Sequence, residues 1–199
     1  MMRAARRLIT GRSFPMSTKK SNQPAQIPDP YRPVVLKFLR EYLDHEIEEL
    51  RESFGVKLDS ADIPTSDDDY LRLPIAESCQ QFALIAAGQT RGLKQRETRI
   101  HVQVLLDNLF SVPGATKYEM PATFWLSDFG SMVLLAMVWS MGIELITVTQ
   151  AVELTGKPHD YFTHAVQRGK LSTYPDKNEP NPTKRTRLVK SEVMALLQQ

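Results

Sequence analysis

The side chains that could do chemistry are spread unevenly along this 199-residue chain. Its four histidines, His45, His101, His159 and His164, are scattered, no glycine-rich phosphate loop is present, and no nucleophile stands in a recognisable catalytic setting. His159 and His164 are five residues apart on a predicted helix, which is typical of surface polar residues rather than of metal ligands. We therefore expect no enzymatic activity, no cofactor and no metal site.

The formal net charge of +2 hides a strong segregation of charge along the chain. Residues 41–69 hold eleven acids against two bases, whereas residues 170–199 hold six bases against three acids. An anionic partner is attracted to a region with a local excess of bases. We therefore expect any such partner to meet the C-terminal end of the chain.

The cysteine content and the hydropathy of the chain indicate the cellular compartment of the protein. The single cysteine, Cys79, excludes a disulfide-stapled secreted scaffold and a zinc or iron–sulfur site built on several thiolates. The longest apolar stretch, residues 129–142, would rise about 21 Å as a helix, less than the roughly 30 Å of a bilayer core. We expect no membrane association and a cytoplasmic location.

The N-terminal residues are treated separately from the fold. Residues 1–15 contain four arginines and no acid, a composition like that of an organellar transit peptide; an overextended start before Met16 is the alternative. Residues 15–33 include five prolines and little apolar material. We predict a disordered leader over residues 1–33.

Residues 34–143 are predicted to form a helical body. Apolar residues recur every three or four positions over 34–54, which predicts an amphipathic helix with one buried stripe that ends before Gly55. Pro74 suits the first turn of a second helix, whose core face includes Cys79. Residues 97–110 fit both a strand and a helix, and their length favours a helix.

One further helix of the body, predicted over 128–141 with Ser127 as its cap, is apolar on nearly every side. Such a helix either runs through the middle of the domain or packs against a second copy of the protein, and the second alternative predicts a homodimer. The body is thus a candidate dimerisation or sensing region. Whether it binds a small-molecule effector stays open, because Phe82, Trp125 and Trp139 suit a core as well as a pocket.

Residues 144–199 carry the clearest local signals. Thr147 and Gln150 have the spacing of a capping box, and Gly156 suits a tight turn between two short helices. The second helix begins at Pro158 and buries Phe162, Ala165 and Val166. Two short strands, 171–174 and 185–189, then form a hairpin or wing, and Ser191 caps a last helix over 192–197. The outward face of the second helix consists of His159, Asp160, Thr163, His164 and Gln167.

This order of capped helix, glycine turn, second helix ending in Arg-Gly-x-Leu, hairpin, Ser-Glu-Val and terminal apolar helix resembles the excisionase and MerR-like winged helix-turn-helix DNA-binding domains. The resemblance covers roughly residues 144–197, and nothing before Leu126 matches a family. It implies a mainly α fold, with an N-terminal helical body followed by a winged helix-turn-helix that carries a small β-hairpin.

The resemblance also implies which residues contact double-stranded DNA. The second helix would enter the major groove, and the wing would lie along the phosphates. The chain departs from the family in three ways: Pro158 stands where a Ser or Thr cap is usual, Asp160 lies on the outer face, and the wing is longer. The implied contacts are His159, Thr163, His164, Gln167 and Arg168 from the helix and Lys184, Arg185 and Arg187 from the wing.

The sequence thus favours a sequence-selective DNA-binding protein, either a transcriptional regulator or an excisionase-like architectural factor. The alternative is a protein-interaction adaptor that uses the same helix-turn-helix fold without binding DNA.

Overall fold

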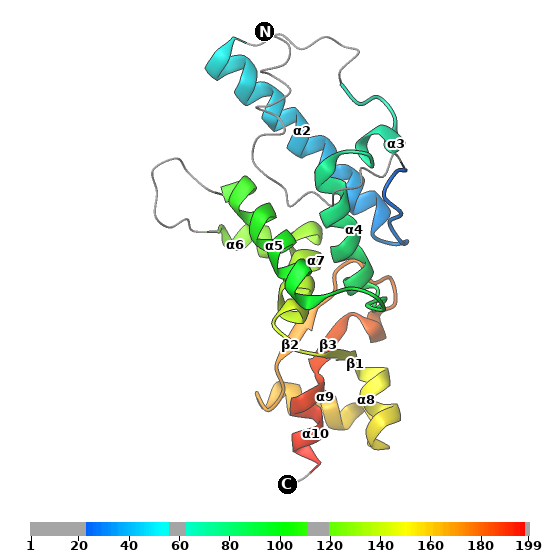
Figure 1. Cartoon of the computed structure of the whole chain (residues 1–199). Coiled ribbons are helices and arrows are strands. Elements are labelled where there is room, and N and C mark those ends of the chain that lie inside the picture. Colours follow the sequence, from blue (N-terminus) through cyan, green and yellow to red (C-terminus); the bar gives the residue numbers. More distant parts are fainter. Residues whose placement is uncertain (1–22, 56–62, 111–119, 198–199) are drawn as a thin grey trace.

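The computed structural model describes residues 23–55, 63–110 and 120–197 (Figure 1). The described chain is mainly helical, with one small three-stranded antiparallel sheet. None of the helices in these three ranges is long and apolar enough to cross a membrane. In chain order the elements are α2 Arg32–Phe54, α3 Asp67–Tyr70, α4 Pro74–Ala86, α5 Gln95–Phe110, α6 Ala122–Trp125, α7 Asp128–Ser140, β1 Leu145–Thr147, α8 Val148–Thr155, α9 His159–Gln167, β2 Thr173–Pro175, the 3-10 helix η2 Pro182–Lys184, β3 Thr186–Val189 and α10 Lys190–Leu196.

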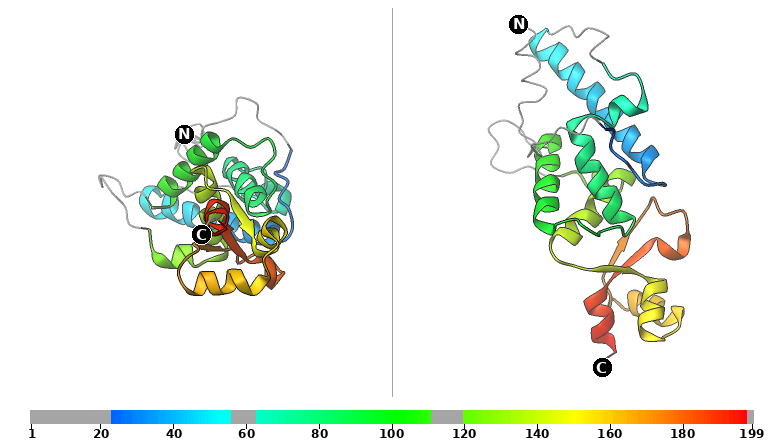
Figure 2. Two further views of the ribbon diagram at one scale, coloured as in Figure 1. Left: turned by 90° about the horizontal axis from the view of Figure 1, so that it is seen from below. Right: turned by 45° about the vertical axis from the view of Figure 1, so that its right-hand side comes forward.

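The apolar helix α7 runs through the middle of the helical body. It packs against α2, α4, α5 and α6, and most of its residues are buried (Figure 2). Ser127 caps it as predicted, since its Oγ accepts a hydrogen bond from the Gly130 backbone N–H at 2.9 Å. The central placement is therefore the observed one, and the apolar surface of α7 does not require a second copy of the chain.

The helices around α7 follow the sequence predictions closely. Residues 95–110 form a helix, which resolves the ambiguity between strand and helix. Pro74 is the first residue of α4, and Phe82 and Cys79 are fully buried on its core face. Burial also raises the pKa of the Cys79 thiol, so that Cys79 is an inert core residue.

Helix α2 differs from the prediction in its second half. Its N-terminal half buries Val35, Leu39 and Leu43, and Gly55 ends it in the left-handed conformation. Phe54 is 65% exposed, however, so the prediction of one buried stripe as far as Phe54 was wrong. The reason is length: 23 residues span about 35 Å, whereas the 13 to 16 residues of α4, α5 and α7 span about 20 to 24 Å. The end of α2 therefore extends beyond the body (Figure 2).

The segment before α2 belongs to the fold. Ile27 and Tyr31 are part of the body core, and the Ala25 backbone N–H donates to the Leu71 carbonyl at 2.9 Å. The predicted leader was therefore wrong for residues 25–33, because two apolar side chains among the prolines suffice to anchor them. Residues 1–22 of the predicted leader lie outside the described residues.

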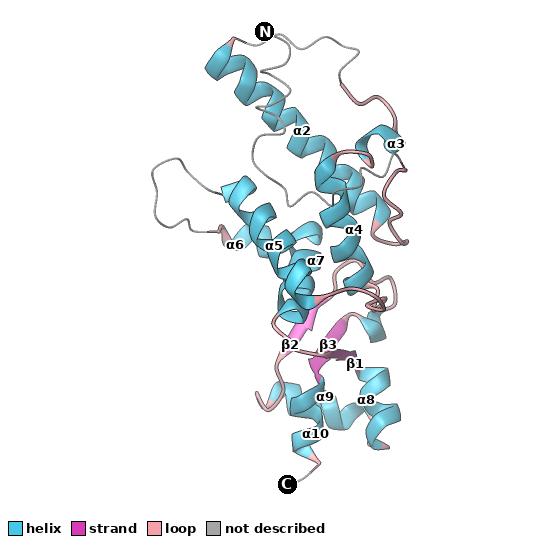
Figure 3. Ribbon diagram, in the orientation of Figure 1, coloured by secondary structure: helices cyan, strands magenta, loops and turns pink. Residues whose placement is uncertain are grey.

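The strands connect the body to the C-terminal helices (Figure 3). The sheet has the order β1-β3-β2, with Ile146 opposite Leu188 and Tyr174 opposite Arg187. The hairpin of β2 and β3 was predicted, but β1 was not, because three residues directly before a helix cap give no alternating pattern. Leu145 and Tyr174 also pack against the body core, so the sheet contacts both parts of the molecule.

The C-terminal helices share a second, smaller core. It contains Ile146, Ala151, Phe162, Leu188 and Val193, among others, and is separate from the body core. Two parts of the prediction fail here. Ser191 does not cap α10, which begins at Lys190. From their sequence positions, Leu154 was also expected to make apolar contacts and Leu197 to close the core, but both are exposed.

Candidate nucleic-acid interface

The helices α8 and α9 are set by local signals in the sequence. The Thr147 Oγ1 accepts from the Gln150 backbone N–H at 3.1 Å, and the Gln150 side chain accepts from the Thr147 backbone N–H at 2.8 Å. This capping box fixes the start of α8. Gly156 takes a left-handed conformation after α8, where a residue with a Cβ would be strained, and the chain then enters α9 after Pro158.

Helix α9 presents one buried and one exposed side. Phe162 and Ala165 face the small core, and the Tyr161 ring packs edge-on against Phe162. On the opposite side the polar residues are all exposed and lie at the end of the molecule away from α2 (Figure 1). The structure therefore brings five of the predicted site residues together on one open surface: His159, Thr163, His164, Gln167 and Arg168.

Two further bases lie at the ends of this helix. Lys157 precedes α9 and places its ammonium over the Tyr161 ring at 5.8 Å, and Lys170 follows the helix. Both are exposed. The sequence prediction did not name them as contacts, although their position immediately outside the helix ends was the available signal. We call the outer residues of α9 together with Lys157, Arg168 and Lys170 the α9 face.

Asp160, which departs from the family pattern, has a structural explanation. It lies in the first turn of α9, where the free backbone N–H groups and the helix dipole favour a negative charge. The N-terminal residue Pro158 makes no side-chain capping bond. Asp160 thus stabilises the start of a helix that has no capping side chain.

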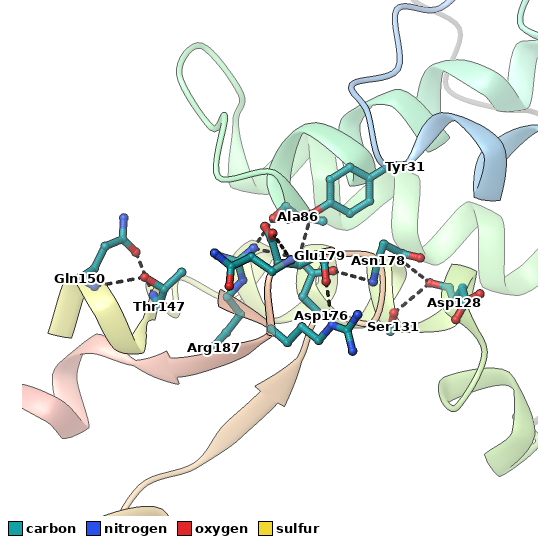
Figure 4. Close-up of polar contacts among 12 residues, drawn as sticks. Tyr31, Ala86, Asp128, Ser131, Thr147, Gln150, Asp176, Asn178, Glu179 and Arg187 are labelled. Atoms are coloured by element: carbon teal, nitrogen blue, oxygen red, sulfur yellow. Dashed lines mark hydrogen bonds and ion pairs between the residues drawn. The ribbon is translucent and has the colours of Figure 1, made fainter. Parts of the chain in front are cut away.

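The loop between β2 and β3, residues 176–185, is docked on the helical body (Figure 4). The Asn178 side chain donates to the Asp128 carbonyl at 2.9 Å, and the Lys177 ammonium donates to the Leu126 carbonyl. These contacts join the loop to residues about 50 positions earlier in the chain. The tip of the hairpin therefore does not project freely beside α9.

Asp176 lies at the centre of this docked loop. It is fully buried, and its Oδ2 accepts from the Tyr31 hydroxyl and from the Arg187 guanidinium, both at 2.8 Å. The same guanidinium donates to the Ala86 carbonyl at 3.0 Å. Burial, and then the neighbouring Asp176 charge, raise the pKa of Tyr31, so that it stays a hydrogen-bond donor. Asp176 and Arg187 together thus connect the segment before α2, the end of α4 and the hairpin.

The three predicted wing residues are separated from the α9 face. Arg187 is mostly buried, and its guanidinium is held by Asp176 and Ala86. Arg185 and Lys184 are exposed, but the Arg185 Nε donates to the Glu179 carbonyl at 2.7 Å, and η2 packs against α8 rather than α9. The predicted phosphate contact of Arg187 is thus replaced by an internal ion pair, which no local pattern in the sequence indicates.

A cleft of about 510 Å³ lies between the body and the C-terminal helices. Trp139 and Leu135 line it from the body, and Thr149, Glu153 and Lys184 line it from α8 and the hairpin. Trp139 therefore borders an open space, whereas Phe82 is part of the core. Within the described ranges, no three His, Cys, Asp or Glu side chains lie close enough together to hold a metal ion.

Comparison with protein-family models, with curated proteins and with solved structures found no match to this chain.

Proposed function

We propose that the C-terminal part of this protein, residues 144–197, binds double-stranded DNA as a winged helix-turn-helix, with α9 in the major groove. The observation that supports this is the α9 face. An exposed row of side chains with hydrogen-bond donors and acceptors, on a helix anchored by Phe162 and Ala165, is what base-edge readout needs. The order β1-α8-α9-β2-β3-α10 is consistent with the same proposal.

Contacts to base edges and contacts to phosphates would come from different parts of the α9 face. Thr163, His164 and Gln167 would face base edges and give sequence selectivity. The bases at the two ends of the helix, Lys157, Arg168 and Lys170, would neutralise phosphates. The docked hairpin would contribute less than a free wing, with Lys184 and Arg185 as its exposed cations.

The proposed role is transcriptional regulation or excisionase-like architecture. In either case the body would position the DNA-binding part through the Asp176 contacts, which join the two regions. A homodimer remains part of this proposal, because two copies would double the number of base contacts at a symmetric site.

The test is binding of the full chain to duplex DNA over a series of salt concentrations. If the three end-of-helix cations contact phosphates, the logarithm of the binding constant should fall with that of salt with a slope of about −3. Arg168→Ala should reduce this slope by about one unit, whereas Lys37→Ala, at an exposed position on α2, should leave it unchanged. Absence of binding, or binding without salt dependence, would refute the proposal.

Sequence selectivity is tested with a pool of randomised duplexes. The wild-type protein should enrich a defined motif, and Thr163→Ala or His164→Ala should change the enriched motif with little effect on the salt slope. Enrichment of the same motif by the variants and by the wild type would remove these two residues from base readout.

A second candidate function is that of a protein-interaction adaptor with the same fold. It is favoured by exposed apolar side chains on helices that pack against each other, Leu154 on α8 and Met194 on α10. If the adaptor function holds, Leu154→Ser should abolish binding to a protein partner, and duplex DNA should not be retained at any salt concentration.

A further inference from the structure

The cleft between the body and the C-terminal helices is lined by both regions of the molecule. The body contributes the end of α4, the turn after it and part of α7, and the C-terminal region contributes β1, α8 and the loop of residues 176–185. Ala86 from the body and Glu179 from the loop are two of the lining residues (Figure 4). All lining residues lie within the described ranges, and the volume of about 510 Å³ is that of a small-molecule site. A molecule bound there would contact both regions at once.

Trp139 gives the cleft an aromatic wall. It is half-buried and packs against the body core, and Leu135 lines the cleft one helical turn before it. In the described part of the chain, the indole N–H of Trp139 has no hydrogen-bond partner. An aromatic ring offers apolar contact to a ligand and attracts cations to its face.

Five charged side chains line the cleft, and two of them are already neutralised within the protein. Arg187 is paired with Asp176, and Glu144 is paired with Lys190, both at 2.8 Å. A charge that is paired in this way attracts a ligand less strongly than an unpaired one. The charges that remain for a ligand are those of Glu153, Glu179 and Lys184.

These three charges leave an excess of negative charge in the cleft. None of them forms an ion pair with a described residue. Glu179 is half-buried, and its Oε1 accepts a hydrogen bond from the Asn181 backbone N–H at 3.0 Å. The neighbouring Arg185 guanidinium donates to the Glu179 carbonyl and not to the carboxylate. Two carboxylates against one ammonium are balanced by a ligand with one positive charge.

We propose that this cleft binds a small organic cation, an amine with an apolar or aromatic body. The ammonium of the ligand would pair with the carboxylates of Glu179 and Glu153, and its body would contact Trp139 and Leu135. Glu179 would be the main ionic partner, because solvent screens a half-buried charge less than an exposed one. Binding would bridge the two regions and stabilise the junction between them.

The experiment uses the full chain with Trp125→Phe, which leaves Trp139 as the only tryptophan. Trp125 does not line the cleft. Three probes of similar size and different charge are titrated, namely 2-phenylethylammonium, 2-phenylethanol and phenylacetate. The ammonium should change the Trp139 fluorescence saturably and bind about fivefold more tightly than the alcohol, which is the gain expected from an ion pair at a partly exposed site. Phenylacetate should bind most weakly.

Two substitutions test the charges of the cleft separately. Glu179→Gln keeps an oxygen for the Asn181 N–H and should weaken binding of the ammonium about fivefold, without changing binding of the alcohol. Lys184→Gln removes a like charge and should tighten binding of the ammonium about twofold. The matched control is Glu41→Gln, at an exposed position on α2 that does not line the cleft, and it should change neither affinity.

Three results would overturn the proposal. If no probe changes the Trp139 fluorescence saturably up to about 10 mM while the protein is folded, the cleft is not a binding site. If the alcohol or phenylacetate binds as tightly as the ammonium, the cleft does not select for positive charge. If Glu41→Gln weakens binding as much as Glu179→Gln, the net charge of the protein and not the cleft attracts the cation. None of these outcomes depends on DNA binding.

Discussion

Helices α7 and α9 differ in how much of their surface is buried. Helix α7 is apolar on nearly every side and packs against four neighbouring helices with most of its residues buried, whereas α9 buries two residues and leaves a polar face open. Enclosure makes α7 the structural centre of the body. The open polar face of α9 is accessible to a polar partner. A mostly buried helix contributes to packing, whereas a helix with an open polar face is available for binding.

The largest expected effect tests the close packing of α7. A Cβ at Gly130 would lie 1.8 Å from the Phe124 carbonyl oxygen, so Gly130→Ala requires the backbone to move. We expect a loss of about 4 kcal/mol in the free energy of unfolding, measured by urea denaturation. Gly88→Ala is the control, because a Cβ there meets nothing within 4 Å and should cost only about 1 kcal/mol for the positive φ. Equal effects of the two variants would contradict the packing described for α7.

The next effect tests the junction between the two regions. Asp176→Ala leaves the mostly buried Arg187 guanidinium and the Tyr31 hydroxyl without their shared acceptor. We expect a loss of about 3 kcal/mol in stability, since removing one member of a buried ion pair leaves the other uncompensated.

The exposed pair of Lys190 with Glu144 supplies the control for this variant. Glu144→Ala should cost less than about 1 kcal/mol, because solvent screens a surface ion pair. A similarly small cost for Asp176→Ala would show that the hairpin is not held on the body as described.

The smallest effect concerns His101, which is buried in the body and hydrogen-bonded to the Ser78 hydroxyl at 2.8 Å. Burial lowers the pKa of His101, opposed in part by Glu77 and Glu97. The unfolded chain therefore binds a proton at this histidine more readily than the folded chain does. The contribution of neutral His101 to the free energy of unfolding is thus fully present above the ordinary histidine pKa of about 6.5 and is lost as the pH drops below it. The urea midpoint should be lower at pH 5.5 than at pH 7.5, and His101→Gln should reduce the difference. An unchanged pH dependence in the variant would refute a role for His101.

Local signals in the sequence account for most of the secondary structure. The capping box of Thr147 and Gln150, the Pro74 helix start and the Ser127 cap each act within four residues, so they can be recognised without a fold. The outward side of α9 follows in the same way from the burial of Phe162 and Ala165. The orientation of α9 was therefore predictable.

Contacts between distant segments were not predictable. Tyr31 and Asp176 are 145 positions apart, and nothing near either residue indicates the other. The buried position of Asp176 also determines where the Arg187 guanidinium lies. A base that was expected to contact phosphate is therefore found in an internal ion pair. The overhang of α2 likewise depends on the lengths of other helices, so its exposed end does not follow from its own pattern.

The most direct test of the proposed function is a gain of affinity at Asp160. This carboxylate is exposed on the α9 face and would repel nearby phosphates. If α9 enters the major groove, Asp160→Asn should raise the affinity for non-specific duplex DNA about threefold or more at low salt. Glu97→Gln, a matched change on α5, should have no effect, which would exclude a contribution from net charge alone. An unchanged affinity for Asp160→Asn, with the variant folded, would contradict the placement of α9 against DNA.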